Sequence, residues 1–272
     1  GKEIYGIAIP YIHIRRFGNG ECFLFDGLPN WEAIKTPVEG LREQLRDGAL
    51  RRKIETERIQ GAGKPDFPEW LGWERVVFTR FEDGSLKSLD WKNVAEIART
   101  TGKAPVDAFF DTWLQDGLRS RCLYVGFANA HLDVLGEMIK SPHGLIGTDA
   151  GAHLDRFFWH GTPARLLGHW CREQKLMSLE EAVWKVTGLP ARVLNLNRGQ
   201  LKVGAPADIT VFDPDKIQDL VSERLPALVD DKEVHRHPPG MRAVVVNGQV
   251  VVEGGECADV YPGKVTWQEL RT

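Results

Sequence analysis

A scarcity of cysteine and the absence of long apolar runs limit what this chain of 272 residues can be. The four cysteines lie far apart and form no Cys-x-x-Cys pair, which argues against a disulfide framework or a zinc ribbon and favours reduced thiols. No stretch reaches the roughly 20 apolar residues that a membrane span needs. The formal net charge is −3, so charge gives no reason to expect nucleic acid or a membrane surface as a partner. We therefore expect a globular protein of the cytoplasm.

The segment from Leu145 to Leu154 carries the strongest chemical signal. A short apolar strand is predicted to end just before Asp149, and small residues then lead to His153. Barrels of alternating strands and helices keep their catalytic groups at the C-terminal ends of the strands. Asp149 is therefore our candidate for a catalytic base and for a metal ligand. The alternative is an aspartate that only orders the turn after a strand.

The hydrophobic periodicity predicts an α/β chain with two parts. The strands predicted before residue 200 are 2–14, 73–81, 122–127 and 144–148, and the helices are 90–101, 105–118, 129–139, 162–174 and one after the capping-box residue Ser178. Residues 15–72 are irregular apart from a charged, helical stretch over 36–60, and we interpret them as an insertion. Short strands and a hairpin at 244–252 follow, so the predicted domains are 1–199 and 200–272. About four strands cannot close a barrel of eight, so only part of a barrel is expected.

Four stretches together carry a family resemblance. They are Gly147–His153, Thr162–Gly168, Ser178–Val183 with Leu189–Arg192 after it, and Gly204–Asp213 with the hairpin that follows. Over residues 70 to 255 the chain resembles the C-terminal half of the amidohydrolase superfamily, in particular its D-aminoacylase (N-acyl-D-amino-acid deacylase) branch. The resemblance implies the C-terminal portion of a TIM-like (β/α)8 barrel plus a small β-sandwich.

The same resemblance implies a metal-dependent hydrolase that cleaves the C–N amide bond of a small molecule such as an N-acyl amino acid. One or two divalent ions, usually zinc, would sit at the barrel mouth, where zinc lowers the pKa of its bound water to about 7. Asp149 would pass the proton of that water to the leaving nitrogen. The family's His-x-His pair and its middle-strand histidines have no counterpart here. The remaining ligands are therefore expected outside this chain, in a missing N-terminal half or a second chain.

Three further residues are candidates for substrate binding. In the related dihydroorotases a histidine at the offset of His153 binds the substrate carboxylate, and Arg156 and His160 are plausible pocket residues. Each could equally be a loop side chain. The D-aminoacylase branch has a Pro-His-Pro-Arg stretch whose arginine holds the substrate carboxylate, whereas this chain has Leu154–His160 with three aromatic residues. That run suggests a larger or more apolar substrate, or simple packing.

Two alternatives to deacylation stay open. A cyclic amide, as in hydantoinases and dihydroorotases, would suit His153. A non-catalytic assembly module would follow if the chain were complete as given, because a catalytic zinc generally needs three protein ligands. We assign no catalytic role to several other polar residues. We expect His235-Arg236-His237 in a surface loop and Cys122 in the core. Arg165 and His169 are expected to pack or pair on a helix, and Asp208 to order a turn.

Overall fold

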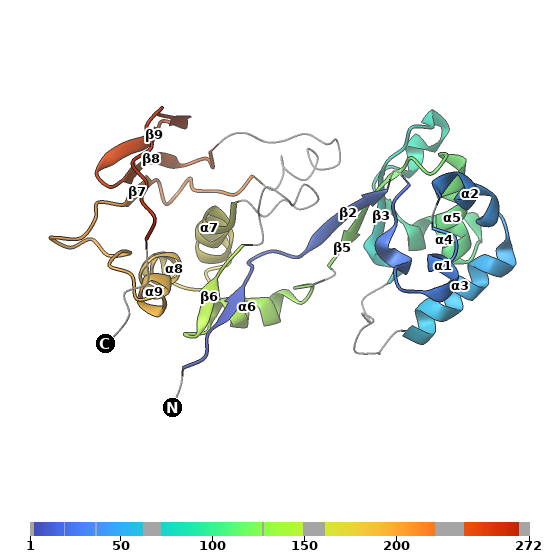
Figure 1. Cartoon of the computed structure of the whole chain (residues 1–272), viewed down its shortest axis with the longest axis horizontal. Helices are drawn as coiled ribbons and strands as arrows, with labels where there is room; N and C mark the ends of the chain where they lie inside the picture. The colour runs from blue at the N-terminus through green and yellow to red at the C-terminus, as the bar shows by residue number, and fades with distance from the viewer. Residues whose placement is uncertain are drawn as a thin grey trace. The chain divides into compact units, whose positions relative to one another are not determined.

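A computed structural model describes residues 3–18, 20–35, 37–61, 72–126, 128–148, 161–220 and 237–266. The chain divides into two compact units (Figure 1). The inserted unit runs from Ile12 to Ala130. The split unit takes the described residues before Ile12 and after Ala130. Each unit has its own hydrophobic core.

The inserted unit is built on an antiparallel sheet of order β2-β5-β3-β4. Its strands are β2 (Ile14–Gly18), β3 (Val76–Arg80), β4 (Lys92–Asn93) and β5 (Arg121–Val125). Its helices are α1 (Pro29–Glu32), α2 (Val38–Gln44), α3 (Gly48–Gly61), α4 (Val94–Thr101) and α5 (Pro105–Gln115). Short 3-10 turns are η1 (Phe23–Phe25), η2 (Trp73–Arg75) and η3 (Gly84–Leu89).

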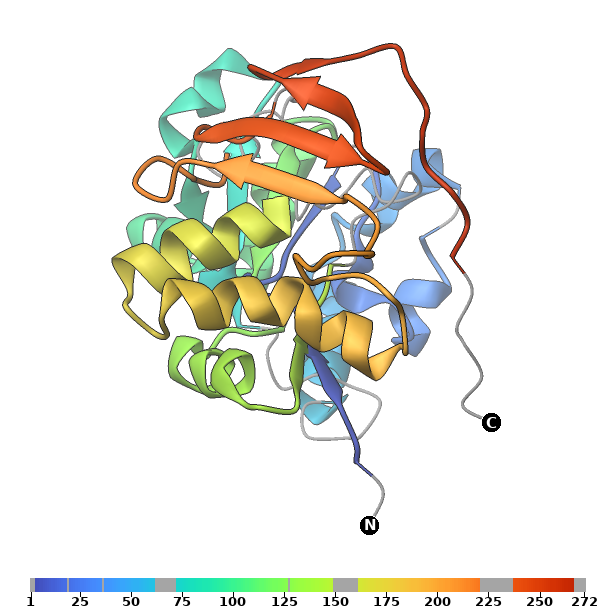
Figure 2. The ribbon, with the colours of Figure 1, turned by 90° about the vertical axis from the view of Figure 1, so that its left-hand side faces the viewer.

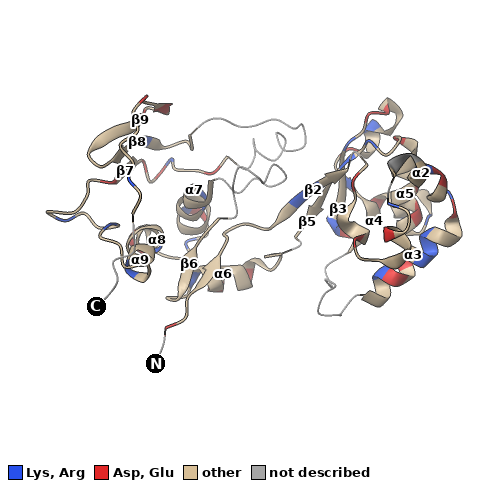
Figure 3. Ribbon diagram, in the orientation of Figure 1, with Lys and Arg blue, Asp and Glu red and all other residues tan. Residues whose placement is uncertain are grey.

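Aromatic side chains fill the core of the inserted unit. Phe109 and Phe110 of α5 are fully buried and lie 5.3 Å apart between ring centroids. Phe25 contacts both rings, at 6.0 and 5.3 Å. α3 carries charges of both signs (Figure 3). Its Arg51 is buried and pairs with Asp107 and Asp111 of α5. Apolar spacing predicted α4 and α5 correctly because each has one face on this core.

The sheet corrects one expectation from the sequence. We counted residues 73–81 and 122–127 as strands of a partial barrel, but β3 and β5 pair antiparallel, whereas barrel strands run parallel. The insertion predicted over residues 15–72 lies within this compact unit, which extends to Ala130. The helices between these strands would show the same apolar spacing if they packed on a parallel or on an antiparallel sheet. Their spacing therefore could not reveal the strand direction.

The split unit contains one parallel pair of strands. β1 (Gly6–Ala8) lies beside β6 (Gly144–Ile146), with Ala8 opposite Ile146. The inserted unit and α6 (Leu132–Lys140) come between them in the chain. After β6 come α7 (Thr162–Arg165), the π-helical segment η5 (Leu166–Glu173), α8 (Leu179–Val186) and α9 (Gly188–Val193). The predicted capping box is present, since Ser178 Oγ accepts from Glu181 N at 3.2 Å and Glu181 accepts from Ser178 N at 2.9 Å.

A second sheet follows the helices, in the order β10-β9-β8-β7. Its antiparallel strands are β7 (Ile209–Phe212), β8 (Met241–Val246), β9 (Gln249–Glu253) and β10 (Glu256–Cys257). In Figure 2 the sheet, orange to red, lies over the yellow helices that follow β6. Phe212 and Met241 pack on the core formed by those helices. Asn247 and Gly248 have positive φ, as a two-residue hairpin turn requires, so the predicted hairpin is confirmed.

The domain division at residue 199 and the barrel and β-sandwich assignments stay predictions. The described part of the chain is of mixed α/β character and contains one parallel strand pair and two four-stranded sheets. Among the described residues, no helix combines the length and hydropathy needed to cross a bilayer.

Candidate functional site

The parallel pair β1–β6 defines the edge where the sequence predicts the active site. Both strands point the same way, so their C-terminal ends meet at one edge. The pairing continues one residue past β6, because Gly147 N donates to Ala8 O at 3.0 Å. Asp149 follows two residues later in the sequence. The four predicted site residues, Asp149, His153, Arg156 and His160, all lie in 149–160, outside the described residues, so their roles stay predictions.

Tyr11 lies just after the C-terminal end of β1, on the β1 side of this edge. It is 2% exposed, and its hydroxyl donates to Asp219 Oδ2 at 2.6 Å. The other carboxylate oxygen of Asp219 accepts from Leu220 N at 2.7 Å. Trp170 of η5 fixes the preceding residue, since its Nε1 donates to Pro10 O at 3.0 Å. Sequence analysis missed this cluster, because Tyr11 and Asp219 lie 208 positions apart and neither belongs to a motif.

Arg165, the last residue of α7, packs on the same tyrosine. Its guanidinium carbon lies 5.6 Å from the centroid of the Tyr11 ring. Its Nε is buried and has no hydrogen-bond partner. Burial lowers the pKa of Arg165 from its ordinary value. The expectation that Arg165 packs is met, and the expectation that His169 forms a pair is also met, since its Nδ1 lies 2.9 Å from Glu173 Oε2.

Several other expectations about polar residues can be checked. Cys122 is fully buried, as expected, and burial raises the pKa of its thiol well above the usual range. Asp208 was expected to order the turn before β7, but its Oδ1 accepts from Asn247 N at 2.8 Å in the turn between β8 and β9. His235 and Arg236 lie outside the described residues, and the ring nitrogen Nε2 of His237 lies 3.4 Å from Cys257 Sγ.

Metal ligands are scarce in the described ranges. They contain no group of three or more histidine, cysteine or acidic side chains that could hold an ion. His237 and Cys257 supply two donors, fewer than the three protein ligands typical of a catalytic zinc. The one metal ligand predicted in this chain, Asp149, lies outside the described residues, so the metal centre stays a prediction.

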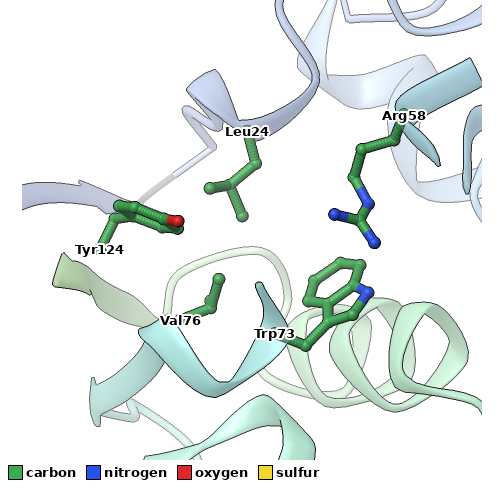
Figure 4. Close-up of a pocket in the computed structure, with 5 residues that line it drawn as sticks. All are labelled: Leu24, Arg58, Trp73, Val76 and Tyr124. Carbon is green, nitrogen blue, oxygen red and sulfur yellow. The ribbon is translucent and has the colours of Figure 1, made fainter. Parts of the chain in front are cut away.

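The inserted unit has a small pocket whose cavity volume is about 10 Å³ (Figure 4). Leu24, Arg58, Trp73, Val76 and Tyr124 line it. Arg58 is ion-paired with Glu55 at 2.6 Å and lies 4.9 Å from the Trp73 ring centroid. Burial raises the pKa of Tyr124 to about 12, so its hydroxyl stays protonated at neutral pH. The pocket is smaller than the roughly 300 Å³ of common ligand sites, and its cation is already compensated, so it offers no centre for hydrolysis.

Comparison with known proteins identifies the family. Residues 68–252 match the amidohydrolase family. An N-acyl-D-glutamate deacylase of Alcaligenes xylosoxydans xylosoxydans is 40% identical over 111 residues, 39% of this chain and 21% of that protein. A D-aminoacylase of the same organism is 38% identical over 129 residues, 44% of this chain and 24% of that protein. The crystal structure of the zinc and phosphonate-inhibitor complex of Bordetella bronchiseptica N-acyl-D-glutamate deacylase is 27% identical, with a TM-score of 0.45, over 80% of this chain and 45% of that one.

The matched segments therefore span less than a third of the two curated relatives. The family match covers residues 70 to 252 of the segment 70 to 255 that the resemblance indicated, and more than half of the sequence. It includes β3 to β8, β9 up to residue 252, and the predicted site segment 149–160. The chain belongs to the amidohydrolase family.

Proposed function

We propose that the protein containing this chain is a metal-dependent amidohydrolase that removes the acyl group from an N-acyl amino acid. The observation that carries this proposal is the family match over residues 68–252, which includes the strand β6 that leads to Asp149. The relatives that support this substrate class are an N-acyl-D-glutamate deacylase and a D-aminoacylase. In this proposal the chain supplies the C-terminal portion of the barrel and a small β-domain.

Asp149 is the proposed general base. It would take a proton from the attacking water and pass it to the leaving nitrogen, which is a poor leaving group unless it is protonated. A divalent ion, with zinc as the first choice, would polarise the carbonyl and activate the water. Asp149 would be one ligand of that ion, and the others would come from outside this chain. His153, Arg156 and His160 remain the proposed substrate contacts from the same segment.

The exposed surface of the parallel pair supports the need for further polypeptide. β1 and β6 contain no charged residue, and Ile7 of β1 is 67% exposed. On α6, Val134 is 56% exposed and Met138 is 44% exposed. Parallel sheets are normally covered on both faces, and open strand edges favour aggregation. We propose that the N-terminal part of the barrel, from the same protein or a second chain, covers this surface.

The test is hydrolysis by the full-length protein, measured before and after removal of bound metal with a chelator. We expect release of amino acid from N-acetyl-D-amino acids, loss of activity with the metal, and recovery when Zn²⁺ is added. Asp149→Asn should lower kcat by at least a hundredfold, a typical contribution of a positioned acid–base group. Ring opening of hydantoin or dihydroorotate without deacylation would favour the cyclic-amide alternative. Inactivity towards both substrate classes after metal reconstitution would refute the hydrolase proposal.

A further inference from the structure

An exposed cysteine lies beside a histidine at the edge of the second sheet. Cysteine is among the most buried residue types in proteins. Cys22 and Cys122 follow this rule, whereas Cys257 of β10 is exposed. The ring nitrogen Nε2 of His237 lies 3.4 Å from Cys257 Sγ, within reach of a hydrogen bond to sulfur. A nucleophile and a base in such contact form the pair that activates a thiol.

Backbone contacts within the split unit hold both members of this pair. On the histidine side, Gln218 N donates to Pro239 O at 3.2 Å, two residues after His237. On the cysteine side, Cys257 pairs with Val252 of β9, which is 7% exposed. Both reactive groups therefore extend from backbone that is fixed independently of their contact. A base and a nucleophile that are positioned in this way need little reorganisation before they react.

The other charged groups on the surrounding segments do not favour a thiolate. They are Glu256 in β10, Glu253 in β9, Arg242 in β8, Asp259 after β10, and Asp213, Asp215 and Lys216 in the segment after β7. In the described part of the chain, both cations of this set approach Asp213, Arg242 at 3.1 Å and Lys216 at 3.8 Å. Carboxylates disfavour a nearby thiolate, whereas an imidazolium stabilises it. His237 is therefore the group suited to take the thiol proton.

We propose that Cys257 and His237 form a reactive thiol site that is modified by low-molecular-weight disulfides. The neutral imidazole takes the S–H proton of Cys257, and the thiolate attacks one sulfur of the disulfide. The S–S bond of the disulfide breaks, and its electron pair leaves with the other sulfur, which takes the proton from the imidazolium. The protein thiol is oxidised to a mixed disulfide and the small molecule is released as a thiol, so excess thiol reverses the modification. The site is independent of the proposed deacylase activity.

The test follows the reaction of glutathione disulfide with the native full-length protein. The adduct on the peptide that contains Cys257 is quantified by mass spectrometry. At about pH 7, His237→Gln should slow formation of this adduct about tenfold, because fewer Cys257 thiols lose their proton. At about pH 10, above the ordinary thiol pKa of about 8.5, the thiol ionises without the histidine, so the rates of the parent and of His237→Gln should converge. A histidine that only shaped the surface would change the rate by the same factor at both pH values.

Cys171 provides a matched control in the same unit. Its side chain is partly exposed, and burial raises the pKa of its thiol. It should therefore form the glutathione adduct more slowly than Cys257 at about pH 7. The proposal is overturned if the parent and His237→Gln react at equal rates at that pH, if the loss in His237→Gln is the same at both pH values, or if Cys171 reacts as fast as Cys257.

Discussion

Lys185 anchors the loop that precedes the strand leading to Asp149, and its removal should destabilise the split unit. Lys185 is 6% exposed, and its Nζ donates to Ser141 O at 2.6 Å and to Gly144 O at 3.2 Å. Lys185→Met keeps the apolar stem and removes both donors. The Ser141 carbonyl oxygen would keep its hydrogen bond from Gly144 N at 2.9 Å, so the loss of the Lys185 bond falls mainly on the Gly144 carbonyl. A buried acceptor without a partner costs about 1–3 kcal/mol, and we expect a loss of about 2 kcal/mol in the free energy of unfolding.

The assay is urea denaturation of the full-length protein, with the midpoint and the slope determined separately. Lys140→Met is the control, because Lys140 ends α6 and is exposed. The control should change the free energy of unfolding by no more than about 0.5 kcal/mol, the usual range for surface substitutions. A Lys185→Met midpoint equal to that of the parent would refute the claim that this lysine secures the start of β6.

The pH dependence gives an independent check on the same residue. Burial lowers the pKa of Lys185 from its ordinary value of 10.5. The unfolded chain therefore binds more protons than the folded one between the lowered value and 10.5, and stability from this group rises with pH through that window. The free energy of unfolding of the parent should increase relative to that of Lys185→Met as pH approaches 10.5. A difference that shrinks over this range would contradict the sign of the shift.

Two further predictions concern close packing and thiol reactivity. A Cβ on Gly168 would lie 2.6 Å from Ile217 O, so Gly168→Ala should lower the free energy of unfolding by about 1–3 kcal/mol. In the control Gly6→Ala, the new Cβ in β1 meets no atom within 4 Å and should be tolerated. Equal urea midpoints for the two variants would refute this packing argument. Cys257 is exposed and should react with a thiol reagent in the native protein, whereas Cys122, whose pKa is raised by burial, should react only after unfolding. Labelling both cysteines at equal rates in the native state would contradict the burial of Cys122.

The sequence alone predicted the elements whose structure depends on residues close together in the chain. The Ser178 capping box closes over three residues, and the Asn247-Gly248 turn is determined by the backbone preferences of those two residues. The family assignment likewise came from short stretches at a characteristic spacing, and the match over residues 68–252 confirmed it. In each case the information lies within a few neighbouring residues.

The features that the sequence did not reveal depend on distant partners. Strand direction in the inserted unit depends on which strands pair, and β2 pairs with β5 more than a hundred residues later. Segments 76–80 and 121–125 are buried over most of their length, as parallel barrel strands are, so they resembled barrel strands. The contact of Tyr11 with Asp219 spans 208 positions and has no motif. We could predict that Arg165 packs, but only the structure shows that its buried Nε has no hydrogen-bond partner.

The place where the inserted unit interrupts the split unit connects these observations. The chain enters the inserted unit directly after Tyr11 and returns before α6, so the interruption occurs in the segment that follows a parallel strand. In α/β barrels such segments line the catalytic edge and vary most between enzymes of different specificity. Tyr11 and Pro10 nevertheless have partners that do not belong to the inserted unit. The bond from the Tyr11 hydroxyl to Asp219 and the bond from Trp170 to Pro10 O both come from the split unit itself. The segment that follows β1 is therefore held by partners within the split unit.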